Sequence, residues 1–267
     1  MARLEGARLE GRTALVTGAA SGFGAGIAAA FAREGAAVLV ADLDAAGAEA
    51  VAAELSRSGL SAEPFATDIT ERASLDAAVA FCESRFGGLD ILVANAGIGQ
   101  RPSPFAETEA DTLRRQFEIN SLGAFQICQA ALPALRRSVE RGFKIGMGAS
   151  ILINVSGIAL VPRPQLYGYG MAKAAAAYLM KALAAELAPE KIRVNGLFPA
   201  IGDTPMLAEF AGGARTEEAA AAFAGALPLG RLITPDDIGQ AALFLSSESE
   251  AGALTGCALP VDGGRCL

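Results

Sequence analysis

The sequence of 267 residues contains no histidine and no tryptophan. The absence of histidine excludes Ser-His-Asp and Cys-His nucleophile pairs, and it excludes zinc held by imidazole groups. The side chain that most often carries protons near neutral pH is therefore missing. If the protein is an enzyme, another side chain must transfer the proton.

Positive charge and cysteine are also scarce. The 22 Lys and Arg residues face 29 Asp and Glu, which gives a net charge of −7 and an isoelectric point near 4.8. Because nucleic-acid binding needs clustered positive charge, we expect no nucleic-acid partner. The cysteines form no C-x-x-C pair and no metal-ligand spacing, so we expect free thiols in a reducing cytoplasm and no metal site. They are Cys82, Cys128, Cys257 and Cys266.

Two uncharged runs, 13–32 and 145–162, have the length of a membrane segment. Several glycines interrupt the first, and Asn154 and Pro162 lie in the second. Residues 3–10 alternate in the sign of their charge, where a secretion signal would be uniformly positive. We interpret both runs as buried elements and expect a soluble, cytoplasmic protein without membrane association.

Short apolar runs alternate with helical patterns along the chain. With 52% hydrophobic and 19% charged residues, the chain can bury a substantial core. Strands are predicted at 13–16, 37–40, 62–66, 89–93, 151–155, 192–197 and 258–261. Helices are predicted from a glycine-rich turn to about residue 34, and at 44–57, 71–86, 111–138 and 168–187.

This alternation predicts right-handed βαβ units, and therefore an α/β fold with a doubly wound parallel sheet of about seven strands and helices on both faces. No change of composition marks a linker, so we expect a single domain over 1–267 with a short N-terminal extension at 1–11. The alanine-rich segment 203–227 is interpreted as a substrate lid, with a variable surface excursion as the alternative.

A glycine-rich turn, with Gly18, Gly22 and Gly24, follows the first strand and opens the first helix. Glycines at such a turn let the backbone approach a pyrophosphate, whose charge is met by free N–H groups at the helix N-terminus. A tight turn without a ligand is the alternative. Asp42 ends the second strand, 18 residues after Gly24, where a carboxylate can bind a ribose diol. It would also repel a 2′-phosphate, so we predict NAD and disfavour NADP.

Tyr169 and Lys173 are four residues apart near the start of a predicted helix and therefore lie on one face. A free tyrosine has a pKa near 10, but an adjacent ammonium group favours the phenolate and lowers that value. Tyr169 is therefore a candidate general acid/base and Lys173 the group that tunes it. A packed tyrosine beside a solvated lysine is the alternative.

With these motifs the sequence resembles the short-chain dehydrogenase/reductase family, in its single-domain form of about this length. The glycine motif, the Y-x-x-x-K motif and several later landmarks match over essentially the whole chain, and the resemblance implies a Rossmann-type fold. The serine of the family lies thirteen residues before the tyrosine and corresponds to Ser156, and its helix asparagine corresponds to Asn120. The implied catalytic residues are Asn120, Ser156, Tyr169 and Lys173.

The resemblance also implies a role for each of these groups. Ser156 and Tyr169 would bind the substrate hydroxyl, and Tyr169 as phenolate would remove its proton while hydride passes to NAD+. Lys173 would lower the pKa of Tyr169 and hold the nicotinamide ribose. Asn120 would position a water that connects Lys173 to solvent.

The resemblance implies two further sets of residues. The cofactor-binding residues are Gly18, Ser21, Gly22, Phe23, Gly24, Asp42, Leu43, Asp68, Ile69, Asn95, Ala96, Gly97, Tyr169, Lys173, Pro199 and Thr204. The predicted substrate pocket consists of Ile98, Ser156, Ile158, Leu166, Tyr169, Ala200 and Met206, with Gly99 and Arg163 as further walls.

The chain departs from the family pattern at two positions. Ala94 replaces an asparagine after the fourth strand, and Ala200 replaces a glycine after the sixth. The first change removes a stabilising side chain, and the second puts the backbone geometry near the nicotinamide in doubt. The segment 143–147 is also longer than is typical of the family.

These expectations give an NAD-dependent oxidoreductase that interconverts a secondary alcohol and a ketone. The alternatives are an NADPH-dependent 3-oxoacyl (acyl-carrier) reductase and a catalytically inactive dinucleotide-binding sensor. Apolar pocket walls favour a hydrophobic or cyclic small molecule, whereas Arg163 and Gln165 fit an anionic or polyhydroxylated one equally well. The family implies a homotetramer, or else a homodimer.

Overall fold

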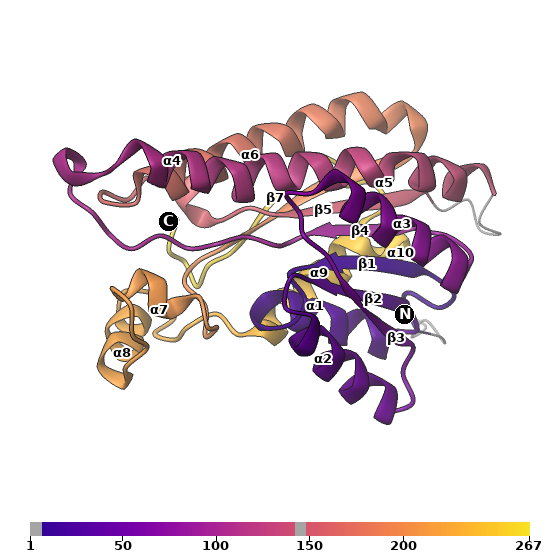
Figure 1. Ribbon diagram of the computed structural model, residues 1–267, viewed down its shortest axis with the longest axis horizontal. Helices are drawn as coiled ribbons and strands as arrows, with labels where there is room; N and C mark the ends of the chain where they lie inside the picture. The colour runs from indigo at the N-terminus through magenta and orange to yellow at the C-terminus, as the bar shows by residue number, and fades with distance from the viewer. Residues whose placement is uncertain (1–6, 142–147) are drawn as a thin grey trace.

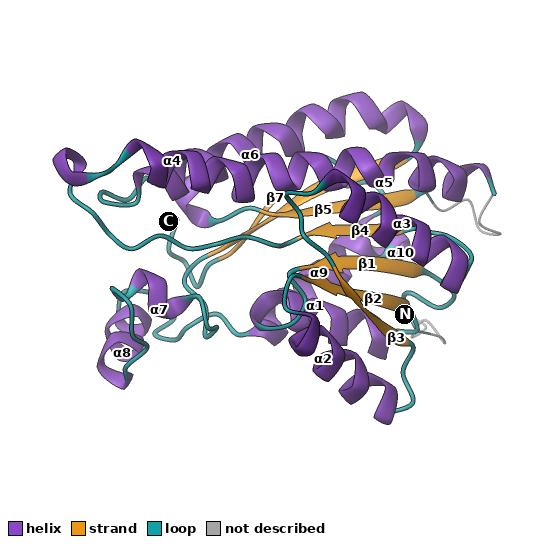
Figure 2. Cartoon of the chain, in the orientation of Figure 1, coloured by secondary structure: helices purple, strands orange, loops and turns teal. Residues whose placement is uncertain are grey.

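The computed structural model describes residues 7–141 and 148–267. Its strands are β1 (Thr13–Thr17), β2 (Ala37–Asp42), β3 (Ala62–Ala66), β4 (Ile91–Ala94), β5 (Ala149–Asn154), β6 (Ile192–Pro199) and β7 (Ala258–Val261). They form one parallel sheet in the order β3-β2-β1-β4-β5-β6-β7. Figure 2 shows the part from β3 through β2, β1 and β4 to β5. The predicted doubly wound, single-domain α/β fold is confirmed.

Helices cover both faces of this sheet (Figure 1). Their bounds are α1 (Gly22–Arg33), α2 (Ala45–Arg57), α3 (Arg72–Phe86), α4 (Ala110–Phe117), α5 (Gly123–Glu140), α6 (Tyr167–Leu187), α7 (Leu207–Phe210), α8 (Glu217–Gly225), α9 (Pro235–Ser246) and α10 (Glu248–Ala251). Short 3₁₀ turns lie at Phe105–Glu107, Gly157–Ala159 and Ala188–Glu190.

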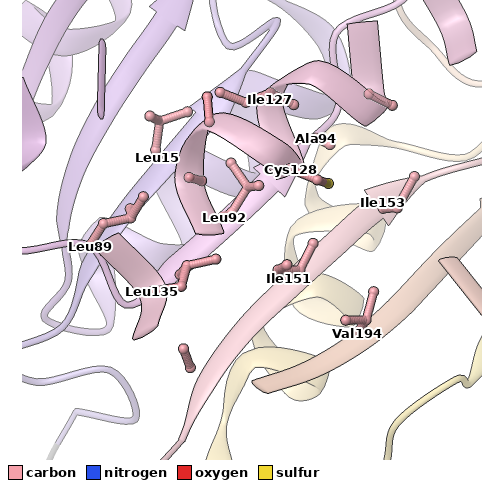
Figure 3. Packing of buried hydrophobic residues seen from close by; sticks show 14 of the residues in the cluster. Leu15, Leu89, Leu92, Ala94, Ile127, Cys128, Leu135, Ile151, Ile153 and Val194 are labelled. Atoms are coloured by element: carbon pink, nitrogen blue, oxygen red, sulfur yellow. The ribbon is translucent and has the colours of Figure 1, made fainter. Parts of the chain in front are cut away.

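Each face of the sheet has its own apolar core, because successive strand residues point to opposite faces. Leu15 of β1 belongs to the core that includes residues of α3, α5 and α6, whereas its neighbours Ala14 and Val16 belong to the core that includes residues of α1, α2 and α9. Figure 3 shows the first of these cores, where Leu92 and Ile151 lie against helix α5. The buried strands are therefore held on both sides, which fixes the positions of their carboxyl ends.

The chain reverses direction across the sheet between β1 and β4. From β1 it proceeds outward to β2 and β3, and then crosses to β4 on the other side of β1. Strands β1 and β4 are adjacent, with Val16 opposite Val93. Ligands of open α/β sheets bind beyond the carboxyl ends of the strands at such a switch point. The fold thus places the loops after β1 and β4 at one candidate site.

The prediction of one continuous helix over 111–138 is wrong, because the helix is interrupted near its middle. Helix α4 ends at Phe117, a wider π turn occupies Glu118–Leu122, and α5 continues to Glu140 with Pro133 inside it. Asn120 lies in the π turn and bonds outward to a neighbouring loop through its amide group. Local periodicity did not signal this break, because the cause is a tertiary contact.

Helix α9 has no counterpart among the predicted helices. Its start carries a clear signal, because Thr234 accepts from the backbone N–H of Asp237 and Asp237 accepts from the N–H of Thr234. Such a capping box, with proline at the first helical position, is a recognisable sequence pattern for a helix N-terminus. The shorter α10 was also missed.

Part of the predicted N-terminal extension 1–11 is described and packs against the domain. Leu9 is buried, and its N–H donates to the carbonyl of Glu34 at the end of α1. Residues 1–6 and the long segment 143–147 lie outside the described residues. In the described ranges, no helix combines the length and the apolar character needed to cross a bilayer.

Candidate active site

A cleft of about 530 Å³ lies beyond the carboxyl ends of β1, β2 and β4. All the residues predicted to bind the cofactor line it, from Gly18 in the glycine turn to Thr204 after β6. These residues come from loops that are far apart in the sequence. The structure therefore brings the whole predicted set to one cavity, while its binding role stays a prediction.

The glycine turn is shaped by backbone contacts that only glycine permits. Gly18 has φ +64°, and a Cβ on Gly24 would lie 2.1 Å from the carbonyl oxygen of Gly18. Helix α1 begins at Gly22, and its N-cap residue Ser21 makes no side-chain cap. The first N–H groups of α1 thus remain available for an anion, which is what a pyrophosphate requires.

Asn95, after β4, holds this turn in place. Its side-chain Nδ2 donates to the carbonyl oxygens of Thr17 (2.8 Å) and Gly18 (3.0 Å). Its Oδ1 accepts from Nδ2 of Asn154 at 2.7 Å, which connects β1, β4 and β5 across the base of the cleft. Asn154 Oδ1 is buried without a partner in the described part of the chain, and Asn154 lines the cleft. A buried, unpaired acceptor on a residue that lines a cavity fits a site made for a polar ligand.

The carboxylate of Asp42 is oriented by the backbone. Its Oδ2 accepts from the N–H of Ala20 at 2.9 Å, and its Oδ1 accepts from the N–H of Asp44 at 3.0 Å. Asp42 therefore stands at the end of β2 with its charge at the wall of the cleft. This is where a ribose diol of a dinucleotide would lie in a doubly wound fold.

The predicted Tyr-Lys pair lies at the inner end of the cleft. Tyr169 and Lys173 are one turn apart on α6, with the ammonium nitrogen 5.8 Å from the centre of the phenol ring. Both are buried, at 8% and 5% exposure. Lys173 Nζ donates to the carbonyl oxygen of Asn154 at 2.8 Å, and burial lowers the pKa of Lys173 to about 8.

In the protein chain without cofactor, burial outweighs any effect of Lys173 on the pKa of Tyr169, and the tuning role of Lys173 stays a prediction. Burial raises the pKa of Tyr169 to about 12, and the negative charge of Glu209 also raises it. A hydrogen bond with Ser156 acts in the opposite direction but does not compensate. The cost of removing a phenolate from water is the larger effect here, so Tyr169 is held in its neutral form.

Ser156 and Asn120 lie on either side of this pair. Ser156 follows β5, and its Oγ accepts from the N–H of Ile158 at 3.3 Å. Asn120 is buried, its Oδ1 accepts from the N–H of Ile98, and its Nδ2 donates to the carbonyl of Ile98. A Cβ on Gly97 would touch Asn120 Oδ1 and lie 3.6 Å from Lys173 Nζ. Asn120 is thus close to Lys173, although its amide secures a loop and does not line the cleft.

A second, smaller arm of about 70 Å³ opens from the same point. It shares Ser156, Tyr169 and Ala200 with the main cleft, and its walls include the predicted Ile158 and Leu166. The predicted Ile98 and Met206 line the main cleft instead, and Arg163 lines the arm. Gly99 and Gln165 line neither cavity; Gly99 accepts from Gln116, and the carbonyl of Gln165 accepts from Ser103 and Gln100.

Several residues of the site are not among those predicted from the sequence. Phe210 of α7 packs edge-on against Tyr169, with ring centroids 5.2 Å apart. Gln100 accepts from the N–H of Tyr169 through Oε1 at 2.8 Å. Arg265 and Cys266, at the end of the chain, line the arm. None of these carries a local sequence signal, because each reaches the site through tertiary packing.

The two positions that depart from the family pattern, Ala94 and Ala200, lie in or directly after strands of the sheet. Ala94 is buried in β4 opposite Ile153 of β5. The N–H of Ala200 donates to the carbonyl of Val261 at 3.3 Å, so β6 and β7 remain paired at this point.

A cleft at the switch point of a doubly wound sheet, with Tyr169 and Lys173 at its inner end, is the arrangement expected of a dinucleotide-dependent oxidoreductase. A family model described as enoyl-(acyl carrier protein) reductase matches residues 18–265. The chain belongs to the short-chain dehydrogenase/reductase family.

Individual relatives agree over nearly the full chain. The 4-formylbenzenesulfonate dehydrogenase TsaC1/TsaC2 of Comamonas testosteroni is 40% identical, over 96% of this chain and 98% of that protein. A crystal structure of 3-ketoacyl-(acyl-carrier-protein) reductase from Brucella melitensis complexed with NADH is 42% identical, with TM-score 0.87, covering 97% of this chain and 100% of that chain. A 7α-hydroxysteroid dehydrogenase complexed with NADH and 7-oxo glycochenodeoxycholic acid is 35% identical, with TM-score 0.88, covering 99% and 98%.

Proposed function

We propose that this protein is an NAD-dependent dehydrogenase that interconverts a secondary alcohol and a ketone, with Tyr169 as the general acid/base. The observation that carries the proposal is the position of Tyr169 and Ser156, which border both the dinucleotide cleft and the smaller arm. A substrate in the arm would therefore meet the cofactor at these two hydroxyl groups. The steroid dehydrogenase relative, with its NADH and 7-oxo ligand, supports the same pairing of cofactor and ketone.

The proton-transfer chemistry follows from the surroundings of Tyr169. Ser156 and Tyr169 would both hydrogen-bond the substrate oxygen, and the neutral Tyr169 is ready to donate a proton to a ketone. When bound, the nicotinamide ring supplies or accepts the hydride. In the direction of alcohol oxidation Tyr169 must first lose its proton, which burial opposes, so oxidation should become faster as the pH rises.

Lys173 would act through its position beneath the phenol ring. Among residues 7–141 and 148–267 its ammonium group donates to one acceptor, the carbonyl of Asn154, and so retains donors for a ribose hydroxyl in the cleft. Asn120 would keep its place near Lys173 and position a water between Lys173 and solvent. Both roles are proposals that rest on the family resemblance and on the proximity of these groups.

NAD is favoured over NADP by Asp42. Its carboxylate is fixed by the two backbone N–H groups of Ala20 and Asp44 and cannot turn away without losing them. A fixed negative charge attracts hydroxyl donors of a ribose and repels a 2′-phosphate. The two related structures described above are complexes with NADH, which is consistent with this preference.

The decisive experiment is the substitution Tyr169→Phe. We expect it to abolish turnover, because Phe cannot transfer a proton, while NADH binding measured by fluorescence stays intact. Tyr178→Phe is the matched control, since Tyr178 lies on the same helix and is 77% exposed. Wild-type-like turnover in Tyr169→Phe would show that another group carries the proton.

The 3-oxoacyl reductase alternative is favoured by one observation, the likeness to the 3-ketoacyl-(acyl-carrier-protein) reductase of Brucella melitensis. Against it stand Asp42 and the net charge of −7, because an acidic acyl carrier needs a basic docking surface. Turnover of a 3-oxoacyl thioester with NADPH, faster than that of simple ketones with NADH, would favour the reductase. A sensor without activity would bind NADH but turn over no substrate in either series.

Three further features complete the proposal. Phe210 of α7 touches Tyr169, and Phe223 of α8 lines the arm, so the segment 203–227 would act as the substrate lid. Exposed Phe125 on α5 and Met171 on α6 are suited to contacts between copies in a homotetramer or homodimer. All four cysteines are free, which fits a reducing cytoplasm.

A further inference from the structure

Two arginines line the small arm beside Ser156 and Tyr169. Arg163 lies in the loop between the 3₁₀ turn Gly157–Ala159 and α6, and Arg265 lies near the end of the chain. The other wall residues of the arm are mostly apolar, and no Asp or Glu is among them. Two exposed arginines thus stand at the wall of an otherwise mostly apolar arm of about 70 Å³, and no carboxylate is among its described wall residues.

Arg265 donates its backbone N–H to the carbonyl of Asp262, but neither guanidinium group forms a hydrogen bond or an ion pair with any residue of 7–141 or 148–267. Many other arginines do pair with carboxylates, for example Arg136 with Glu190 and Arg231 with Asp237. In a chain with net charge −7, carboxylate partners are abundant. The absence of one at Arg163 and Arg265 leaves their guanidinium donors available to a ligand.

The backbone around both arginines is held in place. Arg163 stands between Pro162 and Pro164, whose rings restrict the backbone on either side. The tail that carries Arg265 is tied by Asp262, whose carboxylate oxygens accept from the N–H groups of Gly264 (2.9 Å) and Cys266 (2.8 Å).

A direct contact joins the two segments. Cys266 Sγ donates to the carbonyl oxygen of Gly157 at 3.6 Å, so the tail rests against the turn that precedes Arg163. This contact holds two like charges near each other. Desolvation by neighbouring atoms, and then the charge of Arg265, lower the pKa of Arg163, although its side chain is exposed. An anion between the two guanidinium groups would relieve this repulsion.

We propose that Arg163 and Arg265 together bind an oxyanion of the substrate, a carboxylate or a sulfonate, so that the substrates are hydroxy acids and their keto counterparts. The proposal rests on the proposed function, because Ser156 and Tyr169 in the same arm would then hold the carbinol or carbonyl oxygen. Guanidinium groups match the planar geometry of such oxyanions through paired N–H donors. The pair would thereby select acids over neutral alcohols and fix their orientation toward Tyr169.

Binding is tested separately from turnover. Calorimetry on Tyr169→Phe saturated with NADH would measure the affinity for two keto acids, 3-oxobutanoate and 4-oxocyclohexanecarboxylate, and for their carboxamides. The amides keep the shape and the ketone but lack the charge. Hydrogen bonds to charged groups contribute about 1.5–3 kcal/mol, so we expect the better acid to bind at least about tenfold more tightly than its amide.

Variants of the two arginines test whether these side chains cause the preference for the acid over the amide. Arg163→Gln and Arg265→Gln should each reduce the acid-to-amide affinity ratio by about tenfold. Arg57→Gln is the control for the change in net charge, because Arg57 is exposed on α2, and the ratio should stay as in the parent protein. Equal affinity for acid and amide, no binding of either acid, or the same loss of ratio in Arg57→Gln would overturn the proposal.

Turnover of the matching hydroxy acids and hydroxy amides by the wild-type protein with NAD+ separates this inference from the proposed function. If the amides are oxidised as efficiently as the acids, the dehydrogenase proposal stands and the oxyanion site is wrong. If the keto acids bind through the arginines but no alcohol is oxidised, the oxyanion site stands and the dehydrogenase proposal is wrong.

Discussion

The ammonium group of Lys173 should make the protein less stable at neutral pH than a neutral side chain of similar size would. It is 5% exposed, it lies among the buried residues of α6, and burial lowers its pKa to about 8 from the ordinary 10.5. Lys173→Met keeps most of the aliphatic length and removes the charge. We expect this variant to lose activity and to change the pH dependence of stability.

The magnitude follows from linkage between protonation and folding. The difference between a pKa of about 8 in the folded chain and 10.5 in the unfolded chain corresponds to about 3 kcal/mol. Because the pKa of Lys173 is lower in the folded chain than in the unfolded chain, the free energy of unfolding of the wild-type protein is reduced by this amount below pH 8. It recovers as the pH rises toward 10.5. At pH 6 the buried ammonium group lowers the free energy of unfolding by nearly the full amount, and at pH 9.5 it lowers it by only about 1 kcal/mol. The free energy of unfolding therefore rises by about 2 kcal/mol over this interval.

Loss of the hydrogen bond to the carbonyl of Asn154 costs the variant about 1–3 kcal/mol at every pH, so the absolute stability difference is not diagnostic. The diagnostic quantity is its pH dependence. Relative to Lys173→Met, wild-type protein should gain about 2 kcal/mol in free energy of unfolding between pH 6 and pH 9.5.

Urea denaturation of the cofactor-free proteins at several pH values in this interval measures that difference. Lys181→Met is the matched control, because Lys181 lies on the same helix and also donates to a backbone carbonyl, that of Gly256, but its side chain is exposed. Its stability difference from wild type should not vary with pH. A pH-independent difference for Lys173→Met as well would refute the claim that burial depresses the pKa of this lysine.

Three other substitutions test the cofactor cleft and the fold. Asp42→Asn should lower the ratio of kcat/KM for NAD+ over that for NADP+ by about tenfold or more, because a charged acceptor is lost and the repulsion of a 2′-phosphate with it. Gly24→Ala should weaken NADH binding in a fluorescence titration, since its Cβ would lie 2.1 Å from the carbonyl oxygen of Gly18, whereas Gly225→Ala meets nothing within 4 Å and should bind NADH normally. Thr234→Ala removes the capping box of α9 and should reduce the free energy of unfolding by about 1 kcal/mol, with unchanged NADH affinity.

Much of the fold was predictable because its signals are local. Each buried strand is a short apolar run, and in a parallel sheet covered on both faces such runs need no alternation. All seven strands were predicted, with bounds that differ by a few residues, as at β4. The capping box at Thr234 was an equally local signal for α9, although the apolar periodicity alone did not reveal this helix.

The break between α4 and α5 was not predictable in this way. The residues of the π turn continue the helical pattern on both sides, so the sequence periodicity shows no interruption. The amide of Asn120 bonds to the backbone of Ile98, in a loop that only the folded sheet brings within reach.

The sequence by itself determined the strands, the glycine turn after the first of them and the shared helix face of Tyr169 and Lys173, because apolar runs and helical spacing are local patterns, whereas the order of the strands in the sheet came from the structure. Only the tertiary structure decided the pKa values of Tyr169 and Lys173 and which other residues lie beside them. Burial raises the pKa of Tyr169 and lowers that of Lys173, and burial depends on packing by remote segments. The same packing brings Arg265 to Arg163, since a contact between distant segments has no signature in either one.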